Sequence, residues 1–270
     1  MLRQAKRCAI LACLQPLTRM KNFRLEIYEG AALYIGRDVR TKPHLHHALE
    51  IALALEGRFS VFTNASCLED VTIAVVGSDE LHAFSSDAAL TAFIYLDNEI
   101  QQTHQITEKL CLKEIPLITL EAAIFDKERV ALSSWFEGDD SNILGSQIIR
   151  AVIEKISHTP ATASISFDLR IKEVLRFIQE SVFEEKLSIS RLASMVSLSE
   201  SRLAHLFKAQ TGIPVRKYIL WMRIQKAVVA VLQGFDLTEA AYQAGFADSA
   251  HLSRTFVDMF GVTPSSVLKT

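Results

Sequence analysis

The chain has 270 residues, of which 49% are hydrophobic and 22% are charged, so the composition predicts a packed globular protein and excludes an intrinsically disordered one. The formal net charge is -2, but residues 168-270 carry 13 basic and 10 acidic side chains, whereas residues 1-167 carry 16 and 21. The C-terminal part is therefore the part expected to meet a polyanion. No apolar run is long enough to span a membrane.

The N-terminus, MLRQAKRCAILACLQP, combines basic residues with a short apolar run. The run from Cys8 to Leu14 is at the lower limit for a signal peptide, and no small-x-small cleavage site follows it. We therefore expect a cytoplasmic protein. Reduced thiols are expected as well, because no C-x-x-C spacing occurs among the four cysteines, Cys8, Cys13, Cys67 and Cys111.

Strand-like segments rich in Val, Ile, Phe and Tyr follow between residues 23 and 96, separated by turn residues. They are FRLEIY, AALYIG, LEIALALEG, RFSVFT, VTIAVVG and LTAFIYL. Many short strands at close spacing predict a small barrel or sandwich. Residues 100-112 and 143-157 then predict two helices that trail the strands.

The second of these helices carries an apolar stripe at helical spacing, formed by Ile148, Ile149, Val152, Ile153 and Ile156. One interpretation is that the stripe packs on its own domain. The other is that it forms the interface of a homodimer. Periodicity does not distinguish the partner of an apolar face, so both interpretations stay open.

A polar cluster interrupts the strand region. Residues 44-57 read HLHHALEIALALEG, which places His44, His46 and Glu50 in an H-x-H-x3-E-x6-G array, and His82 follows in GSDELHAF. On a strand, His44 and His46 point to the same face, and three His with one Glu are a legitimate set of transition-metal ligands. The alternative is that these residues sit on exposed strand ends and bind nothing.

Over residues 25-96 this array resembles the metal motifs of cupin barrels. A second cupin motif would carry a Pro and two Gly before its His, whereas here only Gly77 precedes His82. The favoured interpretation is a barrel that keeps the cupin scaffold and has lost the metal, so neither a metal nor another cofactor is expected. Barrel mouths are common small-ligand sites, and the four residues are expected to line an effector pocket as hydrogen-bonding groups. No catalytic residues or enzyme activity are expected, since no Ser-His-Asp or Cys-His constellation stands out.

Residues 158-167 are rich in Ser, Thr and Ala, contain Pro160 and lack charged side chains. This composition predicts a linker between an N-terminal domain, residues 1-157, and a C-terminal domain, residues 168-270.

The C-terminal domain contains one helical pattern twice. Five pairs align at one constant offset, each sharing a predicted role as cap, core anchor or helix stop: Leu192 with Ala241, Ser199 with Asp248, Leu203 with Leu252, Phe207 with Phe256, and Gly212 with Gly261. A constant offset across different roles indicates two copies of one small helical unit. The predicted helix starts are Asp168, Ser188 or Ser190, Ser199, Pro214, Thr238, Asp248 and Pro264.

Two of the predicted helices, the third and the sixth, divide into an inward and an outward face. The inward stripes consist of Leu203, Leu206, Phe207 and Gln210, and of Leu252, Phe256, Met259 and Phe260. The outward faces are short, polar and basic, and consist of Ser201, Arg202, Ala204, His205 and Lys208, and of Ala250, His251, Ser253 and Arg254. Such helices can enter the major groove of double-stranded DNA, although an all-helical protein-binding domain is an alternative.

Residues 168-268 resemble the DNA-binding domain of the AraC/XylS family of bacterial transcription regulators. The matching segments are LASMVSLSESRLAHLFK (192-208), TGIPVRKYI, RIQKA (223-227) and AYQAGFADSAHLSRTFVDMFGVTP (241-264). The resemblance implies a multidomain α+β protein, with a cupin-like N-terminal β-barrel and an all-α C-terminal domain that holds two helix-turn-helix units. It also implies promoter binding as an activator, RNA polymerase as a partner and an unidentified small-molecule effector.

Carried over by position, contact with bases falls on Ser201, Ala204 and His205, and on Ala250, His251 and Arg254. Phosphate contacts fall on Arg202, Lys208 and Lys217, which position a protein without specifying sequence. Relatives often carry an aromatic-Arg pair after the last Pro, where this chain has Ser266 and Val267. Two other functions stay open: a cupin-type metalloenzyme fused to a helical binding module, and a regulator whose N-terminal domain only dimerises.

Overall fold

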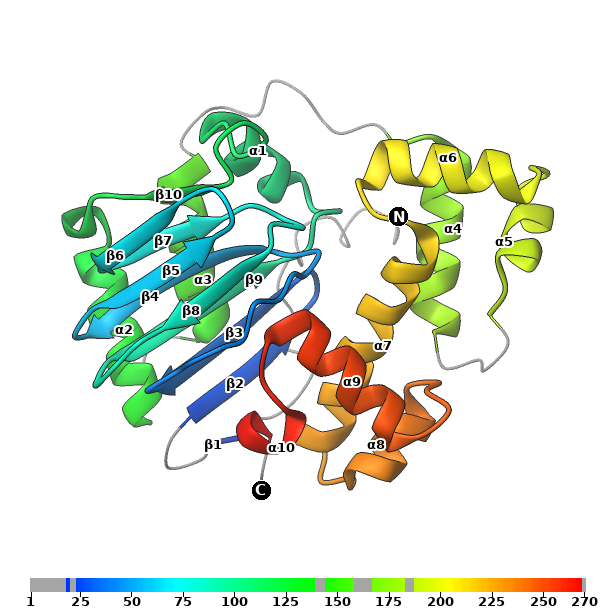
Figure 1. Cartoon of the computed structure of the whole chain (residues 1–270). Helices are drawn as coiled ribbons and strands as arrows, with labels where there is room; N and C mark the ends of the chain where they lie inside the picture. The colour runs from blue at the N-terminus through cyan, green and yellow to red at the C-terminus, as the bar shows by residue number, and fades with distance from the viewer. Residues whose placement is uncertain (1–17, 20–22, 139–143, 158–166, 183–186, 269–270) are drawn as a thin grey trace, which may run out of the picture. The chain divides into compact units, whose positions relative to one another are not determined.

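The computed structural model describes residues 18-19, 23-138, 144-157, 167-182 and 187-268. The chain divides into two compact units, Met1–Thr162 and Ala163–Thr270 (Figure 1). The N-terminal apolar run and nearly all of the predicted linker, 158-167, lie outside the described residues. The boundaries of the two domains therefore stay predictions.

The described residues of the first unit form two antiparallel sheets. A seven-stranded sheet has the order β1-β2-β3-β9-β4-β7-β10, and a three-stranded sheet has the order β6-β5-β8. The strands are β1 (Thr18–Arg19), β2 (Phe23–Tyr28), β3 (Ala31–Arg37), β4 (Leu49–Glu56), β5 (Phe59–Thr63), β6 (Cys67–Val71), β7 (Ile73–Val76), β8 (His82–Ser85), β9 (Leu90–Leu96) and β10 (Leu117–Thr119).

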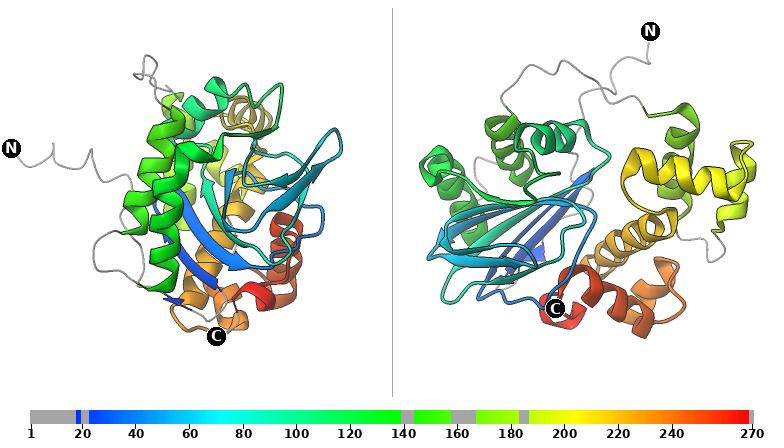
Figure 2. Two further views of the ribbon diagram at one scale, coloured as in Figure 1. Left: turned by 90° about the vertical axis from the view of Figure 1, so that its left-hand side faces the viewer. Right: turned by 45° about the horizontal axis from the view of Figure 1, so that its top comes forward.

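Helices cover one face of the large sheet, and the small sheet lies on the other (Figure 2). The helical segments are α1 (Gln101–Lys109), the short 3-10 helix η1 (Ala122–Phe125), α2 (Asp126–Glu137) and α3 (Gly145–Ser157). In β4, Ile51 and Leu53 belong to the core shared with the helices, while Ala52 and Ala54 belong to the core shared with the small sheet. Because both faces are buried, the strand reads as a continuous apolar run and not as an alternating one.

The apolar stripe of α3 is used inside this unit. Its five hydrophobic residues are all buried and belong to the same core as the large sheet. The first interpretation of the stripe is therefore correct. The stripe is not free to form a dimer interface.

The predicted fold class is confirmed, with one difference in the sheets. Among the described residues, the strands form two separate sheets and not a closed barrel. Backbone bridges between Arg40 and Ser85 and between His44 and His82 tie the connection from β3 to β4 onto β8. The sequence patterns missed β1, β6, β8 and β10, which have only two to five residues each, and η1 and α2, which begin without a side-chain cap hydrogen bond.

In the part of the second unit that the structure describes, all secondary structure elements are helices. Its helices are α4 (Leu169–Ser181), α5 (Ile189–Met195), α6 (Glu200–Thr211), α7 (Val215–Leu232), α8 (Leu237–Gln243), α9 (Ser249–Phe260) and α10 (Pro264–Val267). The pair α5 and α6 lies at one end of α7, and the pair α8 and α9 lies at the other (Figure 1). In the described part of the chain, no helix has both the length and the apolar character needed to cross a membrane.

The predicted caps at Asp168, Ser199 and Asp248 are confirmed, since each side chain accepts a hydrogen bond from a backbone N–H of the first turn. Of the two candidates for α5, Ser188 is the cap. The predicted cap at Thr238 is wrong. Asp236 caps α8, because its carboxylate accepts from two backbone N–H groups while Glu239 bonds back to the backbone of Asp236, which forms a capping box.

The repeat is confirmed in four of the five aligned pairs and is shifted in the first. Leu192 lies four positions after its helix cap Ser188, and the residue four positions after Asp236 is Ala240. Leu192 therefore corresponds to Ala240 and not to Ala241. The second helix-turn-helix has one additional residue in the turn before α9, which restores the offset for the four later pairs.

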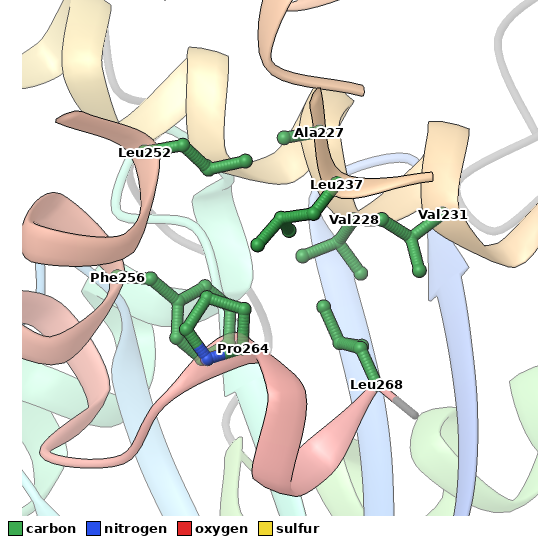
Figure 3. Close-up of a pocket in the computed structure, with 8 residues that line it drawn as sticks. All are labelled: Ala227, Val228, Val231, Leu237, Leu252, Phe256, Pro264 and Leu268. Carbon is green, nitrogen blue, oxygen red and sulfur yellow. The ribbon is translucent and has the colours of Figure 1, made fainter. Parts of the chain in front are cut away.

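Apolar side chains from α7, α8, α9 and α10 converge on one small recess, which forms the core of the second helix-turn-helix (Figure 3). The lining consists of Ala227, Val228, Val231, Leu237, Leu252, Phe256, Pro264 and Leu268. Leu252 and Phe256 point into it from α9, as the inward stripe predicts. Leu268 and Pro264 close it, so α10 packs against the unit without the aromatic-Arg pair.

The buried anchor of α6 provides a test of the inward stripe. Leu203 has 0% of its surface exposed, so Leu203→Ala should lower the free energy of unfolding by about 2–5 kcal/mol. Urea denaturation followed by circular dichroism measures this loss. The matched control is Leu169→Ala, which removes the same atoms from a side chain that is 79% exposed and should change stability by less than about 0.5 kcal/mol. If the two variants gave the same urea denaturation curve, the face of α6 that carries Leu203 would not be the buried one.

Candidate functional site

The outward face of α6 is exposed along its whole length. Its members, Ser201, Arg202, Ala204, His205 and Lys208, are all exposed, whereas the anchors Leu203 and Phe207 are fully buried. The Ser199 hydroxyl accepts from the backbone N–H of Arg202 and fixes the start of the helix. The structure therefore brings the five predicted residues of the first helix-turn-helix together on one surface.

The outward face of α9 is less uniform. Ala250 and Arg254 are exposed, but His251 and Ser253 are half-buried. The His251 ring packs edge-on against Phe246, with 5.2 Å between ring centroids, and the Ser253 hydroxyl donates to the carbonyl of Ser249 over 2.7 Å. Local contacts thus hold both side chains, and Arg254 is the one long polar side chain of the predicted set that extends from this face.

Three cations on these faces are uncompensated. Among the residues that the structure describes, the side chains of Arg202, Lys208 and Arg254 take part in no ion pair. Exposed cationic side chains without an ion-pair partner, on the outward face of a helix, are suited to contacts with phosphates or bases.

The turn of the second helix-turn-helix packs closely on the rest of its unit. Gly245 has a φ of +77°, and a Cβ atom there would lie 2.9 Å from the carbonyl oxygen of Val182, at the end of α4. Arg223 of α7 donates from Nε to the same carbonyl over 3.3 Å. This contact joins α4, α7 and the turn before α9. The equivalent turn of the first helix-turn-helix has Ser197 in the same left-handed region, with a φ of 54°.

The His/Glu array forms a buried cluster in the first unit. His44, His46, Glu50 and His82 are 1–3% exposed, and each offers one potential metal-ligand atom within 4.8 Å of the others. The structure therefore brings all four predicted residues together. The alternative that they sit on exposed strand ends is wrong.

Each histidine of the cluster uses Nδ1 for a backbone contact. Nδ1 lies 2.9 Å from the Lys42 carbonyl in His44, 3.0 Å from the Ala48 carbonyl in His46, and 2.9 Å from the Glu80 carbonyl in His82. Because a carbonyl only accepts, Nδ1 carries the hydrogen in all three rings. The Nε2 atom of His46 lies 3.0 Å from Oε2 of Glu50, and that of His82 lies 3.6 Å from the same oxygen.

Burial and mutual contact shift the pKa values within the cluster. Burial lowers the pKa of His44 to about 3, and the neighbouring His82 and His46 rings act in the same direction. Burial alone raises the pKa of Glu50, but its contacts with His46 and His82 outweigh this and hold the pKa below its usual range. Burial alone lowers the pKa of His82, but the Glu50 carboxylate outweighs it and raises the pKa.

Two neighbours of the cluster were not identified from the sequence. Tyr95 lies directly opposite Glu50 in the β4–β9 ladder, and its ring meets that of His46 edge-on at 5.2 Å. His47 is held between Asp79, at 3.3 Å, and Glu99, at 2.9 Å. Burial alone lowers the pKa of His47, but these two hydrogen bonds outweigh it and raise the pKa to about 9. No local pattern signals either contact, since the partners lie far along the chain.

Comparisons with known proteins place the C-terminal unit in a family. A family profile described as a helix-turn-helix domain matches residues 192–270, which include both α6 and α9. The arabinose operon regulatory protein of Salmonella typhimurium is 30% identical over 127 residues, which make up 46% of this chain and 43% of that protein. The C-terminal unit belongs to the AraC/XylS family.

Solved structures support the fold of both units. An apo variant of ToxT from Vibrio cholerae has a TM-score of 0.57 at 13% identity, and the match covers 88% of this chain and 97% of that chain. ToxT with a bound unsaturated fatty acid has a TM-score of 0.54 at 14% identity, covering 93% and 96%. Identity at this level shows the fold alone. The aligned part spans less than half the length of the arabinose operon regulatory proteins, 43% and 41%.

The close approach at Gly245 predicts that this AraC/XylS turn is intolerant of a side chain. Gly245→Ala should lower the free energy of unfolding by about 1–3 kcal/mol more than Gly234→Ala, measured by urea denaturation. Both glycines have positive φ angles, so both variants are subject to similar backbone strain, but a Cβ atom at Gly234 meets nothing within 4 Å. Equal losses for the two variants would show that the contact with Val182 does not constrain the turn.

Proposed function

We propose that this chain is a sequence-specific DNA-binding transcription regulator in which α6 and α9 enter two segments of the major groove. The observation that carries the proposal is the pair of helix-turn-helix units on one connecting helix, each with its anchors buried and its polar face exposed. A helix of this kind can present its side chains to base edges in the groove.

The length of α7 suits two contacts on one face of the duplex. α7 has 18 residues, which gives it a length of roughly 27 Å at 1.5 Å per residue. Successive major-groove segments on one face of B-DNA are about 34–36 Å apart. The widths of α6 and α9 at its two ends add to its reach, so the two helices suit adjacent segments.

The two helices are proposed to divide the work of recognition. On α6, Arg202 and Lys208 contact phosphates, with Ser201, Ala204 and His205 towards the bases. On α9, Arg254 is the principal base-reading side chain, since an arginine binds the O6 and N7 atoms of guanine with two hydrogen bonds. His251, Ala250 and Ser253 lie beside it and shape the contact surface.

The N-terminal unit is proposed to receive the signal. We expect a cytoplasmic, ligand-responsive activator that works with RNA polymerase, without enzyme activity, and that dimerises through a surface other than the buried stripe of α3. A protein of similar fold, ToxT, binds an unsaturated fatty acid, which supports a ligand-binding role for this architecture. Because the identity is 14%, the effector of this chain is not inferred from that protein.

A cupin-type metalloenzyme fused to a helical module is the second candidate, and the buried His/Glu cluster is the observation that favours it. The two functions differ in a direct assay. A regulator shows DNA binding that changes with a ligand, whereas an enzyme shows metal-dependent turnover. Genomic footprinting of the full-length protein tests the leading proposal, because a regulator protects discrete promoter sites and an enzyme protects none.

Arg254→Ala should weaken binding to the footprinted operator by about 1–3 kcal/mol, because one base pair loses its two hydrogen bonds. A fluorescence-anisotropy titration on the operator and on random DNA of equal length measures both affinities. The informative control is Arg254→Lys, which keeps the charge but lacks the planar fork. Rescue by lysine, or equal losses on both DNAs, would identify Arg254 as a phosphate contact instead.

Lys208→Ala should weaken binding to operator and random DNA alike, since a phosphate contact carries no sequence information. The slope of log affinity against log salt concentration should decrease in magnitude by about 1. Lys172→Ala, which removes an exposed lysine from α4, is the matched control and should leave the slope unchanged. A slope that does not respond to Lys208→Ala would remove α6 from the proposed phosphate contacts.

A further inference from the structure

The buried cluster in the N-terminal unit lies where the two sheets meet. Glu50 stands on β4 of the large sheet, and its side chain belongs to the same face as Ala52 and Ala54, which pack against the small sheet. His82 begins β8 of the small sheet, and the backbones of His44 and His82 exchange two hydrogen bonds of 2.8 and 2.9 Å. Side chains from both sheets therefore converge on one point.

The backbone contacts determine what the cluster presents at that point. With the hydrogen of each ring on Nδ1, the remaining nitrogen, Nε2, is an acceptor in a neutral ring. Glu50 is an acceptor as well. Acceptors in contact repel one another unless a proton or a metal cation lies between them, so the arrangement calls for positive charge. A backbone hydrogen bond to the other nitrogen is also the usual way in which proteins orient a metal-binding histidine.

Two atoms of the cluster lack partners. Oε1 of Glu50 and Nε2 of His82 are buried and form no hydrogen bond among the described residues. Buried polar atoms in native proteins are nearly always satisfied, so such a pair in one site indicates a missing ligand. His47 provides the contrast, because both of its ring nitrogens contact carboxylates and it does not belong to the cluster.

The size of the cluster limits what that ligand can be. The four potential ligand atoms lie within 4.8 Å of one another. Around an ion with bonds of about 2.0–2.2 Å, ligand atoms stand roughly 3.0–4.4 Å apart, so a small contraction suffices. An organic effector does not fit between side chains this close. Three imidazoles and one carboxylate favour zinc, iron, nickel or manganese over calcium or magnesium.

We propose that His44, His46, Glu50 and His82 bind one divalent first-row transition-metal ion, which joins the large sheet to the small sheet. The site goes beyond the proposed function and stands whether or not α6 and α9 bind DNA. Its four ligands are nearly sealed from solvent, which suits an ion that stabilises the fold and leaves no room for a substrate. Metal that binds only the folded unit raises its thermal stability.

The test uses full-length protein without an affinity tag. Elemental analysis of the purified protein should find close to one equivalent of a single transition metal. Dialysis against a chelator should remove it and lower the melting temperature, and titration with zinc or cobalt should restore that temperature at one equivalent. Cobalt should also produce visible d–d absorption typical of nitrogen and oxygen ligands. These measurements use the wild-type protein, so they test the proposal even if a ligand substitution prevents folding.

Variants assign the ligands. Glu50→Gln keeps the shape of the side chain but removes its charge, and should weaken zinc binding by more than about 100-fold, the upper end of the loss seen for residues that only orient a ligand. The matched control is His104→Gln, which removes a histidine of the same unit outside the cluster and should bind zinc as the wild type does.

Three outcomes would overturn the proposal. One is less than a tenth of an equivalent of metal together with no change of melting temperature on adding zinc or cobalt, which would leave a proton as the only cation in the cluster. Another is folded Glu50→Gln protein that binds zinc with unchanged affinity. The third is loss of metal in His104→Gln, which would place the ion elsewhere.

Discussion

The proposed DNA interface depends on the burial of two pairs of apolar anchors, Leu203 with Phe207 and Leu252 with Phe256. Residues four apart lie on one face of a helix, so the burial of these side chains turns the opposite face outward, with His205 exposed on α6 and Arg254 exposed on α9. The orientation of α6 and α9 therefore follows from core packing, and no contact with DNA is needed to set it. The polar face is the consequence of the apolar one.

The connection between the two helix-turn-helix units rests on a second constraint, which is the shared helix α7. Its buried face contributes to the cores at both ends, including the recess that receives Leu252 and Phe256. Arg223 of α7 and the close approach of Gly245 to Val182 also join α4 to the turn of the second unit. The spacing of the two recognition helices is thus fixed by packing along a rigid connector and not by a flexible loop.

The N-terminal unit presents the opposite problem, since polar side chains are buried in it. The large sheet is covered on both faces, and Glu50 lies on β4 between Leu49 and Ile51, both of which are fully buried. Burying a charged carboxylate there costs free energy unless the carboxylate is paired. The three histidines lie next to it, two from a loop and one from the small sheet. The same geometry that satisfies Glu50 in part creates the proposed metal site.

The sequence by itself determined the features that depend on neighbours within one or two turns of chain: the caps at Ser199 and Asp248, the stops at Gly212 and Gly261, the inward stripes and most of the strands. It failed locally at Thr238, where Asp236 has the stronger acceptor, and at the short strands β6, β8 and β10. Only the tertiary structure decided that the α3 stripe faces its own sheet, that Tyr95 and His82 meet Glu50, and that Gly245 touches Val182. These contacts join residues far apart in the chain, and the pattern of a single segment does not record which distant surface it will meet.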